Sequence, residues 1–147
     1  MLQIKIKTFN QLTLTTLYDL LQLRSEVFVV EQDCVYQDID GKDKKALHVL
    51  GYKEEKLVAY TRLFKAGDYF EEASVGRVVV SENERKHKYG NDIMKASITA
   101  INSYYKTDTI LISAQTYLKR FYNSLGFFEI GEEYLEDGIP HIKMKKS

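Results

Sequence analysis

The stretch SVGRVVVSENERKHKYG, residues 74–90, decides the fold. It begins as a strand, because an apolar run ends in three consecutive valines at Val80. A strongly polar loop follows at 81–88, and from Tyr89 onward apolar residues recur at helical spacing. A strand that leads through a loop into a helix directs backbone N–H groups and the positive end of the helix dipole at one point, an arrangement that suits a phosphate.

The loop itself carries three fixed positive charges, Arg85, Lys86 and Lys88. The helix dipole disfavours cations at the start of a helix, so a basic run at this place calls for a reason. Binding of an anion supplies one. The alternative is a solvated run of charges at the start of a helix.

Patterns on both sides of this stretch predict the remaining elements. Alternation of apolar and polar residues indicates strands, and apolar residues three or four apart indicate helices. The expected strands are 2–7, 47–52, 56–64, 74–80, 109–113, 127–130 and 139–144, with hairpin turns at Glu54-Glu55 and Asp137-Gly138. The expected helices run from an N-cap at Asn10 to about residue 29, over 89–104, and over 117–125 with Gly126 closing the last. A polar loop covers 31–45. This order predicts the α/β class, with a mixed, mostly antiparallel sheet and helices on both faces; parallel crossovers are expected in the second half, and antiparallel pairing in the first half and at the end.

Composition limits the kinds of function. The 147 residues, 17.1 kDa, predict a single domain over 1–147 with its own core. Lys and Arg total 21 and Asp and Glu total 21, which argues against a binder of duplex nucleic acid or of acidic membranes. A lone cysteine, Cys34, favours a reducing compartment. The alternating start has no apolar core of a secretory signal, and the aliphatic run at 27–30 is too short to span a bilayer. We therefore expect a cytoplasmic protein with no nucleic-acid or membrane partner.

Metal and cysteine chemistry are poorly supported. If Gly41 is set at position 6 of a calcium loop, Tyr36 occupies position 1 and Leu47 position 12, so the pattern fails. Cys34 and the three histidines contain no closely spaced ligand pair for zinc. We expect no metal. Cys34 as a nucleophile remains possible by residue type alone.

Three segments together resemble the GCN5-related N-acetyltransferases (GNAT). The strand–loop–helix junction at 74–90 resembles the acyl-CoA loop of that family, and Arg85 and Gly90 match the two ends of the family's loop pattern. Lys88 stands where the family has its middle glycine. FYNSLGF at 121–127 is similar to the family's Tyr-x-x-x-Gly-Phe segment and contains Tyr122; Gln115 stands seven residues earlier, where the family often has Asn. LRSEVFVVEQ (23–32), DIDGKD (38–43) and EDGIPH (136–141) resemble the ElaA-type subgroup. The resemblance covers nearly the whole chain in order.

This resemblance implies an acyl-CoA N-acyltransferase fold and transfer of an acetyl group from acetyl-CoA to a primary amine of a small molecule or protein. Tyr122 would protonate the departing thiolate. Candidates for the base that deprotonates the amine are Glu31, His141 and His48. The resemblance leaves open whether the protein forms a homodimer. The implied acetyl-CoA contacts are Val78, Val79, Val80, Arg85, Lys86, His87, Lys88, Tyr89, Gly90, Asn91, Gln115 and Tyr122.

Two further questions stay open at this stage. Arg62 and Arg77 lie within strands, where an unpaired arginine is costly to bury. We expect them to pair with Glu26, Glu31 or the 38–43 loop; the alternative is that they organise a carboxylate of the substrate or of Glu31. A non-catalytic acyl-CoA-binding module and a purely structural protein are the competing functional classes.

Overall fold

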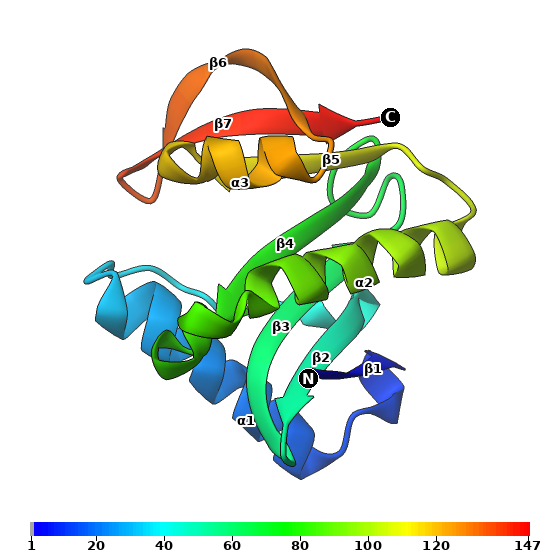
Figure 1. The fold of residues 1–147 in the computed structure, drawn as a ribbon, viewed down its shortest axis with the longest axis vertical. Coiled ribbons are helices and arrows are strands. Elements are labelled where there is room, and N and C mark those ends of the chain that lie inside the picture. Colours follow the sequence, from blue (N-terminus) through cyan, green and yellow to red (C-terminus); the bar gives the residue numbers. More distant parts are fainter. Residues whose placement is uncertain (1) are drawn as a thin grey trace.

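The computed structural model describes residues 2–147, which fold around one seven-stranded sheet of order β1-β2-β3-β4-β5-β7-β6 (Figure 1). The strands are β1 (Gln3–Thr8), β2 (Leu47–Lys53), β3 (Lys56–Phe64), β4 (Ala73–Val80), β5 (Ile110–Gln115), β6 (Phe128–Glu136) and β7 (Ile139–Lys146). The α-helices are α1 (Leu14–Arg24), α2 (Tyr89–Tyr105) and α3 (Lys119–Ser124). Shorter helical segments are η1 (Phe9–Gln11), η2 (Ser25–Glu31, a π-helix that continues α1), η3 (Asp43–Lys45), η4 (Glu82–His87) and η5 (Thr116–Leu118).

The sheet is mixed and mostly antiparallel, as the sequence predicts, and among the described residues one neighbouring pair of strands is parallel. β4 and β5 run parallel across the crossover made by α2, and every other neighbouring pair is antiparallel. β5 and β6, joined through α3, also run in the same direction, because β7 lies between them and pairs antiparallel with both; the second predicted crossover therefore joins parallel strands that are not neighbours.

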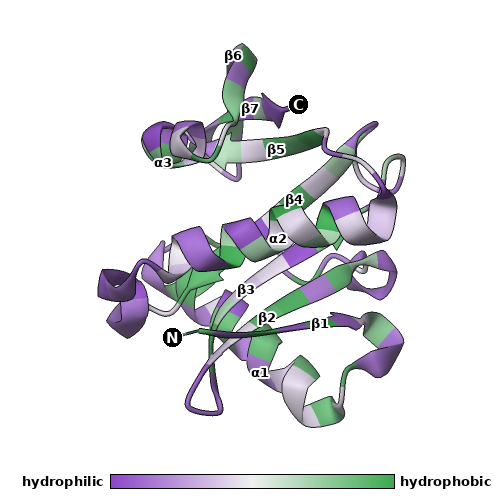
Figure 2. Cartoon of the chain, turned by 45° about the vertical axis from the view of Figure 1, so that its right-hand side comes forward, coloured by the Kyte–Doolittle hydropathy of each residue, from purple (hydrophilic) through white to green (hydrophobic). Residues whose placement is uncertain are grey.

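Helices cover both faces of the sheet, and the alternation within each strand divides the core. Val49 of β2 belongs to the cluster formed with α2 and α3, whereas its neighbour Leu50 belongs to the cluster formed with α1. Side chains of successive strand residues point to opposite faces, so one strand contributes to both clusters. In Figure 2 hydrophobic segments run along β2, β4 and β5, while η4 is hydrophilic.

The first helix begins later than predicted. Asn10 lies in η1, and the N-cap is Thr13, whose hydroxyl accepts a hydrogen bond from the Thr16 N–H at 3.0 Å. Thr13 has the extended backbone of an N-cap and the hydroxyl that satisfies a free amide of the first turn. The helical path then continues through Glu31 as a π-helix.

Gly126 ends α3 as predicted. Its φ of +94° lets the Gly126 N–H donate to Asn123 O (3.0 Å) and the Phe127 N–H to Tyr122 O (3.1 Å). This pair of bonds is the Schellman termination, which favours glycine at its left-handed position. The ending turns the chain sharply from α3 towards β6 and fixes the orientation of α3.

Candidate active site

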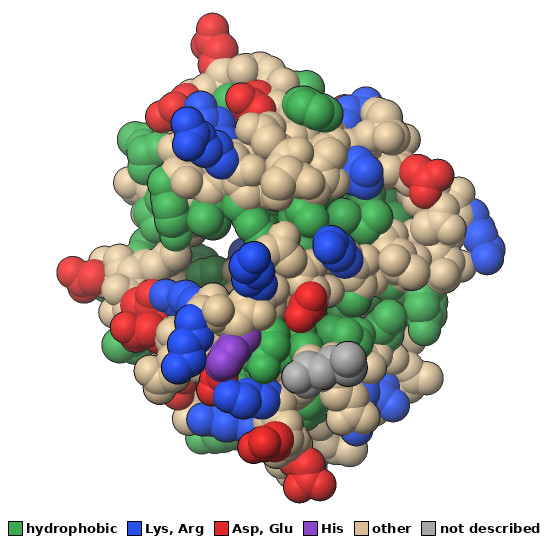
Figure 3. All heavy atoms as spheres, in the orientation of Figure 1, with side chains coloured by type: hydrophobic (Ala, Val, Ile, Leu, Met, Phe, Trp, Pro, Cys, Tyr) green, Lys and Arg blue, Asp and Glu red, His purple; other side chains and the backbone are tan. Residues whose placement is uncertain are grey.

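A cleft opens where β4 and β5 separate. Their pairing ends after Ala73–Ile110 and Ser74–Leu111, and beyond these residues the two strands diverge (Figure 1). The cleft has a volume of about 610 Å³ and is lined by the second half of β4, by β5, and by residues of η2, α2, α3 and the β6–β7 hairpin. Figure 3 shows the molecule hollowed between its two parts at this level. The separation of the two strands therefore forms the cleft at the junction that the strand–loop–helix pattern located only approximately.

β4 reaches the cleft through a β-bulge. Tyr60 pairs with Val79, but Arg62 pairs with Gly76, so Arg77 and Val78 together oppose a single residue of β3. Arg77 adopts a φ of +50°, the left-handed conformation associated with bulges and functional sites. The edge of β4 that faces away from β3 has no strand partner after Ser74, so backbone groups of residues 78–80 lie along the cleft.

The loop before α2 turns at a lysine, although the left-handed conformation required there is unfavourable for a lysine. Lys88 is the N-cap of α2 with φ +60° and ψ +31°, a left-handed conformation that costs a non-glycine residue energy. No side chain caps the helix, and the first helical hydrogen bond runs from Asn91 N to Lys88 O (3.1 Å). The N–H groups at the start of α2 are consequently left for a ligand, as in other anion-binding helix termini. A Cβ at Gly90 would lie 3.4 Å from Phe121 Cζ, so the glycine keeps the space between α2 and α3 open.

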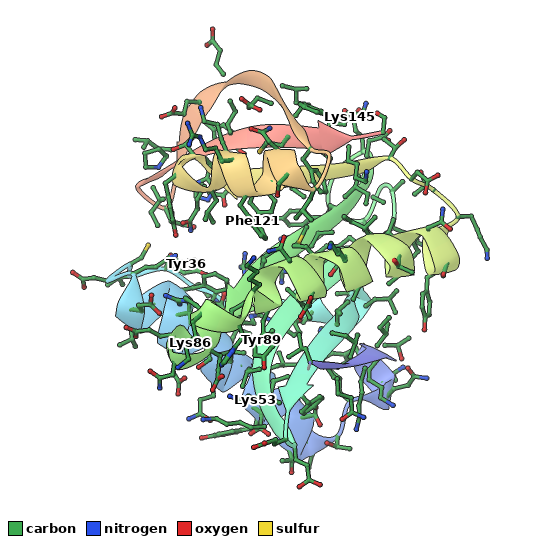
Figure 4. The ribbon with its side chains drawn as sticks, in the orientation of Figure 1. Tyr36, Lys53, Lys86, Tyr89, Phe121 and Lys145 are labelled. Carbon is green, nitrogen blue, oxygen red and sulfur yellow. The ribbon has the colours of Figure 1, made fainter. Side chains whose placement is uncertain are left out.

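The structure brings together most, but not all, of the residues implied as acetyl-CoA contacts. Lys86, His87 and Tyr89 do not line the cleft: the first two are exposed, and Tyr89 is buried in the core under α2 (Figure 4). The side chains of these three residues therefore do not contribute to the cleft wall. The implied acetyl-CoA contacts that do line the cleft are Val78, Val79, Val80, Arg85, Lys88, Gly90, Asn91, Gln115 and Tyr122.

Tyr122 extends from α3 into the cleft wall. It is 5% exposed, and its ring contacts Phe121 and Phe127 edge-on, with centroid distances of 5.0 and 6.1 Å. Burial raises the pKa of its phenol above the ordinary value, so the hydroxyl stays protonated at neutral pH. In Figure 4, Phe121 points from α3 and Tyr36 points from the loop after η2 towards the same space. Tyr122 thus offers a fixed proton donor within a largely aromatic wall.

Glu31 and Arg85 pair with each other across the mouth of the cleft. Arg85 Nη1 and Nη2 donate to the two Glu31 oxygens at 2.5 and 2.7 Å, and Arg85 Nε donates to Val80 O at 3.2 Å. The hydrogen bonds from Arg85 lower the pKa of Glu31 below its ordinary value. A carboxylate held in this way is a weaker base than a free one. Residues 54 positions apart in the sequence, predicted to have separate roles, therefore form one unit.

A second polar group lies at the β5–β7 end of the cleft. His141 of β7 is 6% exposed; its Nδ1 lies 2.7 Å from Ile139 O and its Nε2 lies 3.5 Å from Glu136 Oε2. A carbonyl oxygen can only accept, so Nδ1 carries the proton in the neutral ring and Nε2 keeps its lone pair. Ser113 of β5 donates to Glu136 Oε1 (3.1 Å) and hydrogen-bonds the Tyr134 hydroxyl. Sequence analysis missed Ser113 and Tyr134, because neither has a motif of its own.

Next to the cleft, a buried ion network secures the loop after η2. Arg62 donates to Asp40 (2.6 Å) and Asp43 (3.0 Å), and Arg77 Nε lies 2.8 Å from Asp38. These contacts confirm the expected pairing of both arginines with the 38–43 loop. The third arginine, Arg24, was not predicted; it is 0% exposed and donates to Asp38 (2.9 Å) and Asp43 (2.8 Å).

His48 belongs to this network and cannot be the base. It is 0% exposed and does not line the cleft. Its Nε2 donates to Asp43 O (2.9 Å), so Nδ1 accepts from the Tyr60 hydroxyl (2.6 Å). Burial, with the nearby arginine charges, lowers its pKa below the ordinary value, and the ring remains neutral. The prediction of His48 as a base candidate was wrong because the ring is enclosed by the core.

The described residues contain neither a group suited to hold a metal ion nor a helix able to span a membrane. Within residues 2–147, no three His, Cys, Asp or Glu side chains come together in a group that could hold a metal ion. Among the same residues, no helix is both long and apolar enough to cross a membrane.

Comparison with known proteins defines the class. The family described as "Acetyltransferase (GNAT) domain" matches residues 12–147, and the chain belongs to this family. Its fold is that of the GNAT acyl-CoA N-acyltransferases. A crystal structure of an acyl-CoA N-acyltransferase from Pseudomonas aeruginosa superposes with a TM-score of 0.92 at 38% identity, covering 99% of both chains.

Within the family, the chain is similar to ElaA. Protein ElaA of Escherichia coli K12 is 45% identical over 139 residues, 93% of this chain and 91% of that protein. The crystal structure of Escherichia coli ElaA superposes with a TM-score of 0.93 at 42% identity and covers 100% of both chains. A UPF0039 protein of Schizosaccharomyces pombe is 40% identical over 146 residues, 98% of this chain and 96% of that protein. The resemblance to the ElaA-type subgroup is confirmed.

Proposed function

We propose that this chain is an acetyl-CoA-dependent N-acetyltransferase that acetylates a primary amine of a small molecule or peptide in the cytoplasm. The observation that carries the proposal is Tyr122, a buried phenol in a cleft that also contains the free edge of β4 and the uncapped start of α2. A molecule that only binds acyl-CoA has no need of a proton donor there. Family membership supports acyl transfer in general; the acetyl group, the amine and the roles of individual residues are our proposal.

Two parts of the cleft support acetyl-CoA as the ligand in this proposal. The unpaired edge of β4 offers backbone donors and acceptors to an amide-rich arm, as a neighbouring strand would. The start of α2 offers N–H groups and a positive dipole end to phosphates, and Lys88 adds a charge beside them. The missing side chain at Gly90 keeps this approach open. When bound, acetyl-CoA supplies an activated acetyl thioester.

The residues of the chain then have separate tasks. We assign to His141 the uptake of the amine proton at Nε2; the contact of Nδ1 with Ile139 O supports this role, because it leaves the lone pair on Nε2. An alkylammonium has an ordinary pKa near 10.4, so such a base, acting directly or through water, is needed to generate the nucleophile. Tyr122 holds a proton at its hydroxyl for the departing thiolate. Glu31, paired with Arg85, is the weaker base of the two candidates and orients that arginine at the cleft mouth.

Replacing Tyr122 with phenylalanine tests the proposal. We expect Tyr122→Phe to keep its affinity for acetyl-CoA within about twofold and to lose roughly 10²- to 10⁴-fold in kcat, measured as thiol release. Tyr117, an exposed tyrosine that also lines the cleft, provides the matched control: Tyr117→Phe should retain activity. Full activity of Tyr122→Phe would rule out its role as the acid.

The same experiment separates the competing class. A non-catalytic acyl-CoA-binding module would bind acetyl-CoA and CoA in the wild type, yet release no thiol with any amine. Thermal unfolding reports binding independently, because ligand at about 100 times Kd adds roughly 2.7 kcal/mol of stability. A stabilisation by acetyl-CoA and CoA but not by ATP is expected. The absence of any stabilisation would contradict the cofactor assignment itself.

A further inference from the structure

We infer that the acceptor is an amine that enters as a cation and carries no carboxylate near its amino group, and that Glu136 holds its ammonium. This inference rests on the proposed function and specifies its substrate class. It concerns the end of the cleft at β5 and the β6–β7 hairpin, opposite the basic start of α2. The residues that line this end are Tyr36, Tyr69, Phe70, Ser113, Glu136 and His141.

Glu136 is fixed in place but retains capacity for another donor. Its Oε1 accepts from Ser113 Oγ (3.1 Å), and its Oε2 lies 3.5 Å from His141 Nε2. Its side chain is 44% exposed, and a carboxylate accepts about four hydrogen bonds in total. An ammonium bound to Oε2 would lie beside His141 Nε2, the atom proposed to take its proton. Glu136 is therefore a specificity residue that presents the amine to His141.

The arginine that lines this end is already paired. Arg77 lines the cleft, but it is held by Asp38 (2.8 Å) and Asp40 (3.5 Å). In the network around it, three arginines face three aspartates. The guanidiniums of these three arginines are therefore already paired with aspartates and are not available to a carboxylate on the acceptor. Such a carboxylate would instead meet the like charge of Glu136, with Asp137 next to it in the turn.

The other charged groups do not reverse this balance. Arg85 is paired with Glu31, and Lys88 lies at the start of α2, at the far end of the cleft. Lys143 of β7 stands 4.9 Å from the centre of the Phe70 ring and is not part of the cleft lining. Lys42, 6.0 Å from the centre of the Tyr69 ring, is likewise outside the lining. Among the described residues that line this end, the charged side chains that have no arginine or aspartate partner are the carboxylates Glu136 and Asp137, and these favour a cation.

Aromatic rings complete the acceptor end. Tyr69 stacks on Phe64 with a centroid distance of 5.1 Å, and Phe70 meets Tyr69 edge-on at 4.7 Å. These contacts hold the 65–72 loop against the sheet, and Tyr36 adds a third ring from the loop after η2. Each of these rings already has a cation of the protein over it: Arg77 lies 5.7 Å from the centre of the Tyr36 ring, Lys42 6.0 Å from that of Tyr69, and Lys143 4.9 Å from that of Phe70. The rings therefore serve to exclude water from an apolar chain and are not the seat of the ammonium. The body of the amine is therefore expected to be apolar or aromatic.

The test uses amines and amino acids that differ only in the carboxylate. The pairs are phenethylamine and phenylalanine, tyramine and tyrosine, and isoamylamine and leucine. Thiol release from acetyl-CoA gives kcat/KM, and calorimetry gives binding of each compound to the complex of the protein with CoA. We expect each amine to exceed its amino acid by at least about tenfold, the effect of one charge contact of about 1.4 kcal/mol.

The variant Glu136→Gln connects this preference to the residue. It should raise KM for the amines about tenfold, change kcat less, and reduce the ratio between amine and amino acid. Glu133→Gln, an exposed carboxylate on the same strand, is the matched control and should behave as the wild type. Equal or better use of the amino acids, or an unchanged ratio in Glu136→Gln, would overturn the inference. If no compound binds or reacts while CoA still binds, the acceptor assignment fails alone; if CoA does not bind, the proposed function fails.

Discussion

Substitution of Asp43 by asparagine should destabilise the fold strongly, although it replaces only one carboxylate oxygen with an amide N–H₂ group. Asp43 Oδ1 accepts from Arg24 (2.8 Å) and from Arg62 (3.0 Å), and its side chain is 8% exposed. Burial alone would raise the Asp43 pKa, but the hydrogen bonds and charges of the two arginines outweigh it and lower that pKa below its ordinary value. The carboxylate is therefore ionised and bridges two buried cations.

The expected loss of stability follows from the two arginines, Arg24 and Arg62, that stay buried after the substitution. In Asp43→Asn the amide oxygen can still accept from Arg24 and Arg62, but the two buried guanidiniums face one negative charge fewer. Breaking a buried ion pair by removing one partner typically costs about 3–5 kcal/mol. For a domain of this size, 1 kcal/mol corresponds to roughly 2–4 °C, so the melting temperature should fall by about 6–20 °C.

Urea unfolding at pH 7, followed by circular dichroism, measures this loss. Asp19→Asn, an exposed aspartate on α1, is the matched control and should change the free energy of unfolding by less than about 0.5 kcal/mol. Because buried pairs are poorly screened, the loss should be nearly the same at low and at high salt. A loss below about 1 kcal/mol, or one that disappears in salt, would refute the view that this network holds the cleft-side loop by buried charge.

Two further predictions concern pH and the loop before α2. The lowered pKa of His48 means that the unfolded state binds a proton more readily than the folded state, so stability should be full above about pH 6.5 and decrease as pH falls below it. The lowered pKa of Asp43 adds a second decrease below about pH 4, and urea midpoints between pH 8 and pH 3 check both; a flat profile from pH 7 to pH 5 would contradict the first. Lys88→Gly should relieve the left-handed strain and raise the free energy of unfolding by about 0.5–1 kcal/mol, while weakening acetyl-CoA binding about two- to fivefold through loss of the cation. Lys106→Gly, at the left-handed C-cap of the same helix, should give the stability gain without the change in affinity; identical effects of the two variants on binding would remove Lys88 from the phosphate site.

Most of the elements could be predicted because they depend on local patterns. Largely apolar runs at 47–52 and 56–64 mark two buried strands, and Glu54 and Glu55 between them both take the positive φ angles of a tight hairpin turn. Gly126 closes α3 because its left-handed conformation is a local requirement. The start of α1 was misplaced because Asn10 and Thr13 are both good N-caps, and the choice between them depended on the η1 turn that precedes the helix. The insertion of β7 between β5 and β6 has no local signal at all.

By itself, the sequence determined the strand–loop–helix junction at 74–90, the place of Tyr122 and the family. These are set by residue types at short, fixed separations, and such separations persist in any fold that the chain adopts. Only the tertiary structure decided that β4 and β5 diverge into a cleft, that Glu31 pairs with Arg85, and that Arg24 and His48 lie in one buried network. Each of these joins side chains from different elements, whose meeting depends on how strands pair and diverge rather than on spacing along the chain. A carboxylate or imidazole acquires its charge state and its role from those neighbours, and for that reason the sequence could name Glu31, His48 and His141 as candidates but could not choose among them.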